Sequence, residues 1–198
     1  MAVRVGINGF GRIGRLALRA LIESGRTDVE VVGINDLGSV EMNAHLLKYD
    51  SVHGTLNTDV KIDGDTIDVG TGPIKVTQER DPTKLPWGEL GVDIAYECTG
   101  IFASRDKAAT HLAAGAKKVL ISAPAGDADK MVVYGVNHDQ LTAEHTVVSN
   151  ASCTTNCLAP VADVLHKAVG IEKGFMTTIH SFTGDQRTVD TLHSDPRR

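Results

Sequence analysis

The chain has 198 residues, 41% of them hydrophobic, which is enough apolar material for one buried domain, or for one domain and part of another. Its formal net charge is −5, so no surplus of Lys and Arg can neutralise phosphates, and we expect no nucleic-acid partner. No apolar run approaches membrane-spanning length, no signal-like segment opens the chain, and three cysteines are too sparse for a disulfide framework. These features favour a cytoplasmic protein without a membrane partner.

The first 35 residues have the pattern of a strand, a tight turn, a helix and a second strand. Residues 3–8 form an apolar run that gives way at Gly9 to helical spacing, and Gly25 ends that helix. Residues 29–34 form a second apolar run, which is typical of a strand covered on both faces of a parallel sheet. The pattern predicts one βαβ unit in about thirty residues.

The later segments continue this pattern after an antiparallel interruption. Residues 55–78 predict short antiparallel strands around a turn at Asp63-Gly64. Beyond them we expect strands within 92–100, 118–123, 131–136 and 145–150, a helix over 104–114, a helix over 152–169 despite Pro160, and a strand over 174–180. The parallel units end near residue 150, where we place a domain boundary, and no terminating element follows the last loop, so we expect the second domain to be incomplete.

The turn after the first strand contains Gly9, Gly11 and Gly14 in the spacing GxGxxG. The first glycine makes the turn, the second lets the backbone approach a pyrophosphate, and the third lets the helix pack close to the strand. Glycine-rich turns also serve tight packing, so the motif alone leaves both readings open. Asp36 ends the second strand, 22 residues after Gly14, where a carboxylate can accept hydrogen bonds from the ribose hydroxyls of NAD and would repel the 2′-phosphate of NADP. The alternative interpretation is that Asp36 is an ordinary turn residue.

Residues 149–157 read SNASCTTNC, and four interpretations compete for its two cysteines. A zinc site needs about four ligands and no second pair is near in sequence, while a disulfide would close a tiny loop. A buried packing residue is the better interpretation of Cys157, one turn inside the predicted helix. Cys153 falls at the predicted start of that helix, where backbone N–H groups and the helix dipole stabilise a thiolate, so we interpret it as a nucleophile.

A nucleophilic cysteine needs a nearby base or cation, and His180 follows 27 residues later at the edge of a polar loop. The chain has eight histidines, so chance alone places one within that distance. A lone histidine is more often a surface or core residue than a catalyst. Spacing therefore leaves the pair of Cys153 and His180 open.

Five segments together resemble the phosphorylating glyceraldehyde-3-phosphate dehydrogenases. They are INGFGRIGR near the start, ERDP at 79–82, ECTG at 97–100, SNASCTTNC at 149–157 and HSFTGDQ at 180–186, and their order and separations match along the whole chain. The resemblance covers the NAD-binding domain and the opening of the catalytic domain, somewhat more than half of a full-length member. It implies an α/β fold with a Rossmann-type, doubly wound sheet and antiparallel excursions over residues 1–150, followed over 151–198 by the first part of a truncated α+β catalytic domain.

The resemblance also implies roles for individual residues. The nucleophile is Cys153 and its partner is His180; beside the glycine turn, the NAD contacts fall on Arg12, Ile13, Asp36, Arg80 and Ser122; Ser152 and Thr154 match ligands of the attacking inorganic phosphate, and Thr183 matches a ligand of the substrate phosphate. No metal is implied. A full-length relative would form a homotetramer.

The implied reaction is the NAD-dependent oxidation and phosphorylation of glyceraldehyde 3-phosphate to 1,3-bisphosphoglycerate through a cysteine thioester. Erythrose-4-phosphate dehydrogenase is the close rival, and Thr183 and the SAPA stretch at 122–125 favour the triose enzyme. Leu37 fits the NAD-specific pattern and Leu192 departs from it, with NAD still favoured over NADP. Because several family ligands lie beyond Arg198, we expect a fragment with weak or absent turnover. A module that only binds NAD is the second hypothesis.

Overall fold

Six parallel strands form the centre of a nine-stranded sheet in the computed structural model, which describes residues 2–181. The parallel strands are β1 (Val3–Asn8), β2 (Val29–Asn35), β7 (Pro73–Thr77), β8 (Ile94–Glu97), β9 (Lys118–Ile121) and β11 (Val147–Ser149). They lie in the order β7-β2-β1-β8-β9-β11, so β2 and β7 are added on one side of β1, and β8, β9 and β11 are added on the other. This order is that of a doubly wound Rossmann-type sheet, which confirms the predicted fold class.

Three short strands complete the sheet at its edges. β10 (Lys130–Met131) pairs parallel to β11 at one edge, and the hairpin of β5 (Lys61–Asp63) and β6 (Thr66–Asp68) pairs antiparallel to β7 at the other. The turn of that hairpin lies at Gly64, whose φ of 57° is left-handed. The antiparallel excursions predicted for residues 55–78 are therefore confirmed, except that β7 also joins β2 in parallel.

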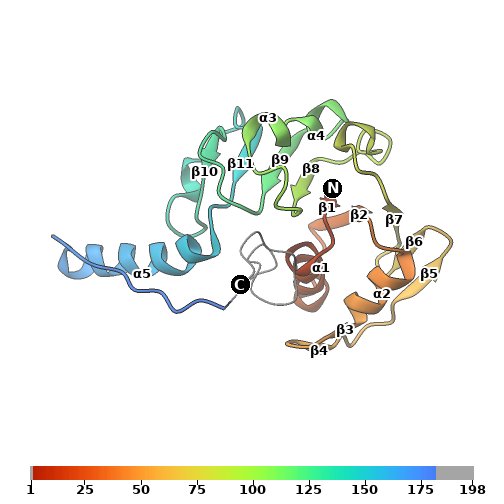
Figure 1. Ribbon diagram of the computed structural model, residues 1–198, viewed down its shortest axis with the longest axis horizontal. Coiled ribbons are helices and arrows are strands. Elements are labelled where there is room, and N and C mark those ends of the chain that lie inside the picture. Colours follow the sequence, from red (N-terminus) through yellow and green to blue (C-terminus); the bar gives the residue numbers. More distant parts are fainter. Residues whose placement is uncertain (1, 182–198) are drawn as a thin grey trace, which may run out of the picture. The chain divides into compact units, whose positions relative to one another are not determined.

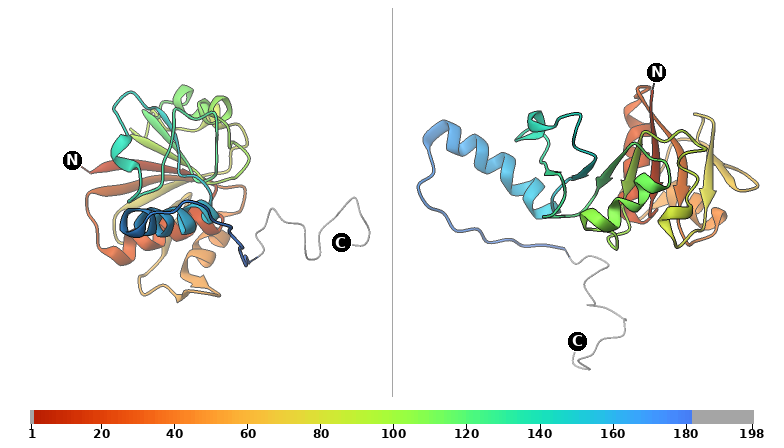
Figure 2. Two further views of the ribbon diagram at one scale, coloured as in Figure 1. Left: turned by 90° about the vertical axis from the view of Figure 1, so that its left-hand side faces the viewer. Right: turned by 90° about the horizontal axis from the view of Figure 1, so that it is seen from above.

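Helices cover both faces of the sheet, α1 (Arg12–Ser24) and α2 (Val40–Lys48) on one side and α3 (Arg105–Ala108) and α4 (Thr110–Ala113) on the other (Figure 1, Figure 2). Successive residues of a strand point to opposite faces. Val31 packs in the core that contains Leu18 of α1, and its neighbour Val32 packs in a separate core around Trp87. Burial on both faces explains why the sequence of β2 is an apolar run and does not alternate.

Several elements differ from the sequence-based expectation. The helix expected over 104–114 is two short helices, because Ala109 ends α3 and precedes α4. The strand expected over 131–136 extends only to Met131, because Val133 N donates to the side chain of Asn137 at 2.8 Å and a turn follows. The sequence pattern did not predict α2, whose N-terminus is capped by Ser39, nor the hairpin that follows it, β3 (Tyr49–Asp50) and β4 (Gly54–Thr55).

Helix α5 (Cys153–Val169) follows β11 and contains Pro160, as predicted. The chain divides into two compact units, Met1–Val161 and Ala162–Arg198, so α5 begins in the first unit and continues into the second. No residue of α5 is buried. The strand predicted over 174–180 is wrong, because a strand needs a neighbour to pair with and no described strand pairs with this segment. Within residues 2–181, no helix is long and apolar enough to cross a membrane.

Candidate functional site

A pocket of about 440 Å³ lies at the carboxyl ends of β1, β2 and β8. Doubly wound sheets bind their ligands there, where the strand order reverses between β1 and β8. The lining residues are Asn8, Gly9, Gly11, Asn35, Asp36, Leu37, Glu79, Arg80, Cys98, Thr99, Ile101 and Phe102. Four residues that the sequence analysis assigned to the cofactor thus come together, namely Gly9, Gly11, Asp36 and Arg80.

The three glycines of the turn differ in what surrounds them. Gly9 has φ of 90°, and a Cβ built on it would lie 2.8 Å from Thr99 N. A Cβ on Gly14 would lie 2.2 Å from the Gly9 carbonyl oxygen, so only glycine lets α1 start this close to β1. A Cβ on Gly11 would meet nothing within 4 Å, and Gly11 is the N-cap of α1 without a side-chain capping bond. The first turn of α1 therefore presents backbone N–H groups and a helix dipole to open space, which is an arrangement that binds a pyrophosphate.

The carboxylate of Asp36 is fixed by two backbone N–H groups. Phe10 N donates to Oδ2 and Gly38 N donates to Oδ1, both at 2.8 Å. Each oxygen keeps further accepting capacity toward the pocket, which a ribose diol can use. Together with the open space at Gly11, this oriented acceptor fits a dinucleotide such as NAD.

Four predicted cofactor residues are not in the lining of this pocket, namely Gly14, Arg12, Ile13 and Ser122. Arg12 donates to Asp50 at 3.1 Å, and Ile13 is exposed on α1. Ser122 follows β9, where its N–H donates to the Glu97 carbonyl at 2.9 Å. Arg12, Ile13 and Gly14 lie in the first turn of α1, directly after Gly11 of the lining, and Ser122 directly follows β9, so the assignment of all four to the cofactor stays a prediction.

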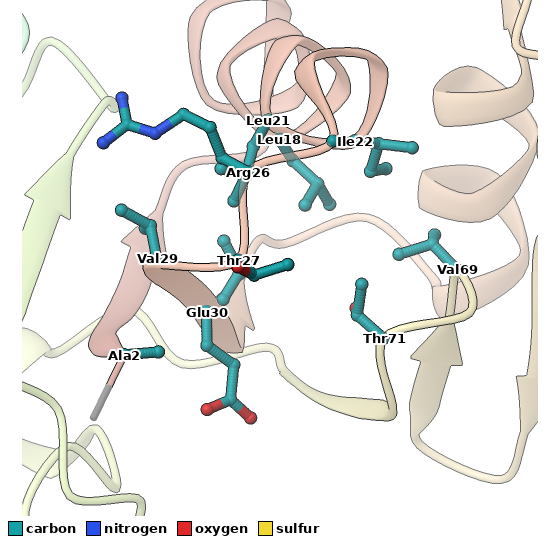
Figure 3. Close-up of a pocket in the computed structure, with 12 residues that line it drawn as sticks. Ala2, Leu18, Leu21, Ile22, Arg26, Thr27, Val29, Glu30, Val69 and Thr71 are labelled. Atoms are coloured by element: carbon teal, nitrogen blue, oxygen red, sulfur yellow. The ribbon is translucent and has the colours of Figure 1, made fainter.

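A second hollow of about 410 Å³ lies between the end of α1 and the start of β2, among Leu18, Leu21, Ile22 and Val29 (Figure 3). It is at the amino end of the parallel strands, and its walls are mainly apolar. Doubly wound parallel sheets bind nucleotides at the carboxyl ends of their strands, so this hollow lies at the end opposite to the one where a nucleotide is expected.

Cys153 is the first residue of α5 and is exposed. Ser152 caps the helix, because its Oγ accepts from Thr155 N at 3.0 Å. Asn156 Nδ2 donates to the carbonyl oxygens of Asn150 and Ser152 at 2.7 and 2.9 Å, which fixes the approach to the helix. The sequence-based expectation that Cys153 starts a helix is confirmed.

The residue two before Cys153 has a strained backbone. Ala151 has φ of 58°, and among residues 2–181 it is the single non-glycine residue with positive φ. It is buried, and its N–H donates to Ser149 Oγ at 3.1 Å. Such a conformation costs about 1–3 kcal/mol and persists where the surroundings enforce it, often at functional sites. It turns the chain from β11 sharply into α5, at whose first position Cys153 lies.

The sequence analysis also singled out His180, Thr183 and Cys157. His180 lies in the irregular segment of the second unit, is exposed, and has Nδ1 2.5 Å from the Ser181 carbonyl oxygen. Its pairing with Cys153 stays a prediction, and Thr183 lies outside the described residues. The expectation of a buried Cys157 is wrong, because this thiol is exposed on α5, where no described element covers the helix.

Sequence reasoning overlooked a buried polar row beside the pocket, formed by Asn35, Asn8 and Glu97. The three residues are register partners on β2, β1 and β8. Their common position, a polar residue at the end of an apolar strand, was the available signal. In the described residues no group of three or more His, Cys, Asp or Glu could hold a metal ion.

The chain is similar to known proteins along its whole length. Residues 3–105 match the family model for the glyceraldehyde 3-phosphate dehydrogenase NAD binding domain, and residues 152–198 match that for the C-terminal domain. Glyceraldehyde-3-phosphate dehydrogenases of Xanthobacter flavus and Cereibacter sphaeroides are 74% and 67% identical to it over 195 residues, which are 98% of this chain and 58% of each relative. The enzyme of Zymomonas mobilis is 61% identical over 199 residues, which are 100% of this chain and 59% of the relative.

Two statements follow from these matches. The chain spans somewhat more than half the length of these curated relatives. The first match supports NAD as the cofactor of the pocket beside the glycine turn. Because that match covers residues 3–105 of the 198, the chain belongs to the glyceraldehyde 3-phosphate dehydrogenase family.

Proposed function

We propose that this sequence serves the NAD-dependent oxidation and phosphorylation of glyceraldehyde 3-phosphate, giving 1,3-bisphosphoglycerate through a thioester on Cys153. The observation that carries the proposal is the position of Cys153, exposed at the first residue of α5 and directly after the strained turn at Ala151. A sulfur atom there is close to the positive end of the helix dipole, which favours negative charge. The names of the relatives support the substrate.

The residues beside the glycine turn hold the cofactor in this proposal. The N–H groups at the start of α1 bind the pyrophosphate, and the Asp36 carboxylate accepts from the ribose hydroxyls of the adenosine half. Arg80 in the pocket lining, Arg12 and Ile13 in the first turn of α1, and Ser122 directly after β9 complete the proposed set. NAD, when bound, accepts the hydride that leaves the aldehyde carbon.

Cys153 and His180 carry the covalent chemistry in this proposal. The Cys153 thiolate attacks the aldehyde carbon, and His180 as an imidazolium gives its proton to the aldehyde oxygen, which forms a hemithioacetal. Neutral His180 then takes the proton of this hydroxyl group back as the hydride departs. The product is a thioester. Inorganic phosphate then attacks the thioester carbonyl, which releases the acyl phosphate and restores the thiolate.

Hydroxyl groups on both sides of Cys153 bind the attacking phosphate in this scheme. Ser152 Oγ lies 2.7 Å from Thr155 Oγ1. When the Thr155 hydroxyl donates to Ser152 Oγ, the hydroxyl hydrogen of Ser152 can be donated to a phosphate oxygen. Thr154 is the second ligand, and Thr183 binds the phosphate of the substrate.

We further propose the domain boundary at residues 150 and 151, with a dinucleotide-binding domain before it and the N-terminal part of the catalytic domain after it. The start of the C-terminal family match at residue 152 supports this boundary. A homotetramer, implied by the resemblance, and a cytoplasmic location, expected from the composition, belong to the same proposal for the full-length protein.

The test is the formation of NADH, followed at 340 nm, from NAD, phosphate and glyceraldehyde 3-phosphate. Cys153→Ser is the inactivating variant, and Cys157→Ser is its matched control one helical turn away. We expect at most weak turnover from this chain, which Cys153→Ser abolishes and Cys157→Ser retains, and which is faster with the triose than with erythrose 4-phosphate. No NADH, with NAD still bound in calorimetry, would leave the chain as an NAD-binding module. Faster turnover of the tetrose would overturn the substrate assignment.

A further inference from the structure

Glu97 is a buried carboxylate that the proposed chemistry does not use. It ends β8, is 1% exposed, and lies at the same level as Asn8 and Asn35 across three parallel strands. Asn35 Nδ2 donates to Asn8 Oδ1 at 2.7 Å, and Asn8 Nδ2 donates to Glu97 Oε2 at 2.6 Å. A hydrogen-bonded row therefore runs along the floor of the cofactor pocket.

The row continues on the far side of Glu97 into the core. His111 Nε2 lies 2.9 Å from Glu97 Oε2, and Trp87 Nε1 lies 3.0 Å from His111 Nδ1. An indole N–H can only donate, so Nδ1 accepts, and the remaining ring hydrogen is on Nε2, where it is donated to Glu97. His111 is 0% exposed and Trp87 is 1% exposed, so this chain of bonds is shielded from water.

Trp87 is seated on the sheet by two glycines that are register partners. A Cβ on Gly6 of β1 would lie 2.7 Å from the Trp87 ring, and one on Gly33 of β2 would lie 2.9 Å from it. The ring therefore lies directly against the backbone of both strands, which fixes the end of the row. Any larger residue at either position would displace the indole.

Glu97 and Asn35 also form hydrogen bonds with two loop residues that line the pocket, Thr99 and Glu79. Glu97 Oε1 accepts from Thr99 N at 2.7 Å and from Thr99 Oγ1 at 2.5 Å. Asn35 Oδ1 accepts from Glu79 N at 2.8 Å, and Asn35 Nδ2 donates to the Glu79 carbonyl at the same distance. Glu79 precedes Arg80, so the row sets the two loops that flank the pocket.

The Thr99 loop in turn supports the glycine turn. A Cβ on Gly9 would lie 2.8 Å from Thr99 N and 2.9 Å from the carbonyl carbon of Cys98, so the backbones of the two loops are in direct contact. A shift of Thr99 would move the first glycine of the pyrophosphate turn. Glu97 accepts four hydrogen bonds, from Asn8, His111 and the two donors of Thr99, and an ionised carboxylate is the group that can accept all four.

We propose that Glu97 is a positioning residue of the cofactor site, which holds the Thr99 loop and, through Asn8 and Asn35, the Glu79 loop, and couples both to Trp87. The inference rests on the proposed NAD site. Because Trp87 is the only tryptophan of the sequence, its indole N–H gives a single reporter signal for the row.

The test compares Glu97→Gln with the wild-type chain by NAD calorimetry and by NMR of the Trp87 indole N–H. A glutamine keeps the size of the side chain but replaces one accepting oxygen by a donating amide that faces other donors, so we expect NAD to bind about ten- to a hundredfold more weakly. NAD should shift the indole signal of the wild type, and this shift should be lost in Glu97→Gln. Glu30→Gln, at a half-exposed salt bridge with Arg4, is the control for charge, and Ile67→Val, in the other core, is the control for stability.

The outcomes separate this inference from the proposed function. A wild-type chain that does not bind NAD would refute the proposed cofactor site. A wild-type chain that binds NAD, beside a Glu97→Gln variant that binds equally well, would overturn the role of Glu97 alone. Should Glu97→Gln fail to fold, Thr99→Val and Thr99→Ser replace it, and Thr99→Val, which lacks the hydroxyl donor, should weaken NAD binding more than Thr99→Ser; equal binding by the two variants would overturn the inference. Nitrogen shifts that place the His111 proton on Nδ1 in the wild type would also overturn the inference.

Discussion

Replacement of Gly14 by alanine tests whether close packing of α1 on β1 creates the cofactor site. The new Cβ would lie 2.2 Å from the Gly9 carbonyl oxygen, about 1.2 Å short of the 3.4 Å at which ordinary contact begins, and 2.8 Å from Ile7 Cγ2. The Gly9 carbonyl belongs to the turn, and Ile7 belongs to β1, the strand before the turn. The methyl group can be accommodated only if the turn moves.

The expected magnitude follows from two opposing effects. Overpacking of this kind costs about 1–3 kcal/mol, and the better helix propensity of alanine offsets at most about 1 kcal/mol. We expect a net loss of about 1–2 kcal/mol in the free energy of unfolding, or about 2–8 °C in Tm for a unit of this size. NAD binding should fall by more than tenfold, because the N–H groups that face the pyrophosphate move with the turn.

Gly11→Ala is the matched control, since its methyl group would meet nothing within 4 Å of protein. Its cost in stability should be small, about 0.5–1 kcal/mol for the poorer N-cap, yet NAD binding should fall as strongly, because the methyl group occupies the space of the ligand. Thermal unfolding and NAD calorimetry of both variants check this. A Gly11→Ala variant that binds NAD like the wild type would refute the reasoning, because no pyrophosphate could then lie against Gly11.

Three further predictions concern other parts of the site. Ala151→Gly should raise the free energy of unfolding by about 0.5–1 kcal/mol in urea titrations, because it relieves a left-handed φ of 58°, and a loss of stability would show that Ala151 is unstrained. Asp36→Asn should weaken NAD binding about tenfold in calorimetry, because an amide cannot accept from Phe10 N, Gly38 N and a ribose together. It should also reduce the preference for NAD over NADP, and an unchanged preference would contradict the role of Asp36. Burial raises the pKa of the Cys98 thiol to about 12, so iodoacetamide at pH 8 should label Cys153 and Cys157 but not Cys98 in mass spectra. Stability should fall by up to about 1.4 kcal/mol per pH unit as pH rises above 9, since the unfolded thiol loses its proton first. Cys98→Ala should lessen this slope without abolishing it, because burial also raises the pKa of Tyr96; an unchanged slope would contradict this account.

The parallel sheet was predictable from the sequence because its signals are local. An apolar run over residues 29–34 is sufficient to predict a strand covered on both faces, and GxGxxG marks the turn between β1 and α1. The start of α5 was equally local, since Ser152 caps the helix that Cys153 begins. The same local signals could not predict that α3 ends at Ala109, where neither glycine nor proline interrupts the helical pattern.

The polar row at the floor of the pocket could not be predicted in this way. Asn8 and Glu97 are 89 residues apart, and only the order of the strands makes them neighbours. Trp87 lies in a loop, and its role depends on Gly6 and Gly33, whose side of the sheet is set by the register of β1 with β2. Likewise, the strained φ of Ala151 has no signature in the residue type, because alanine rarely adopts it.

The most direct test of the central claim is peptide mass spectrometry of the chain after incubation with NAD and glyceraldehyde 3-phosphate in the absence of phosphate. We predict a phosphoglyceroyl adduct on Cys153, in equal amount to the NADH formed, that disappears when inorganic phosphate is added. The adduct should persist in Cys157→Ser and be absent from Cys153→Ser. An adduct on Cys157, or bound NAD without any acylated cysteine, would contradict the account.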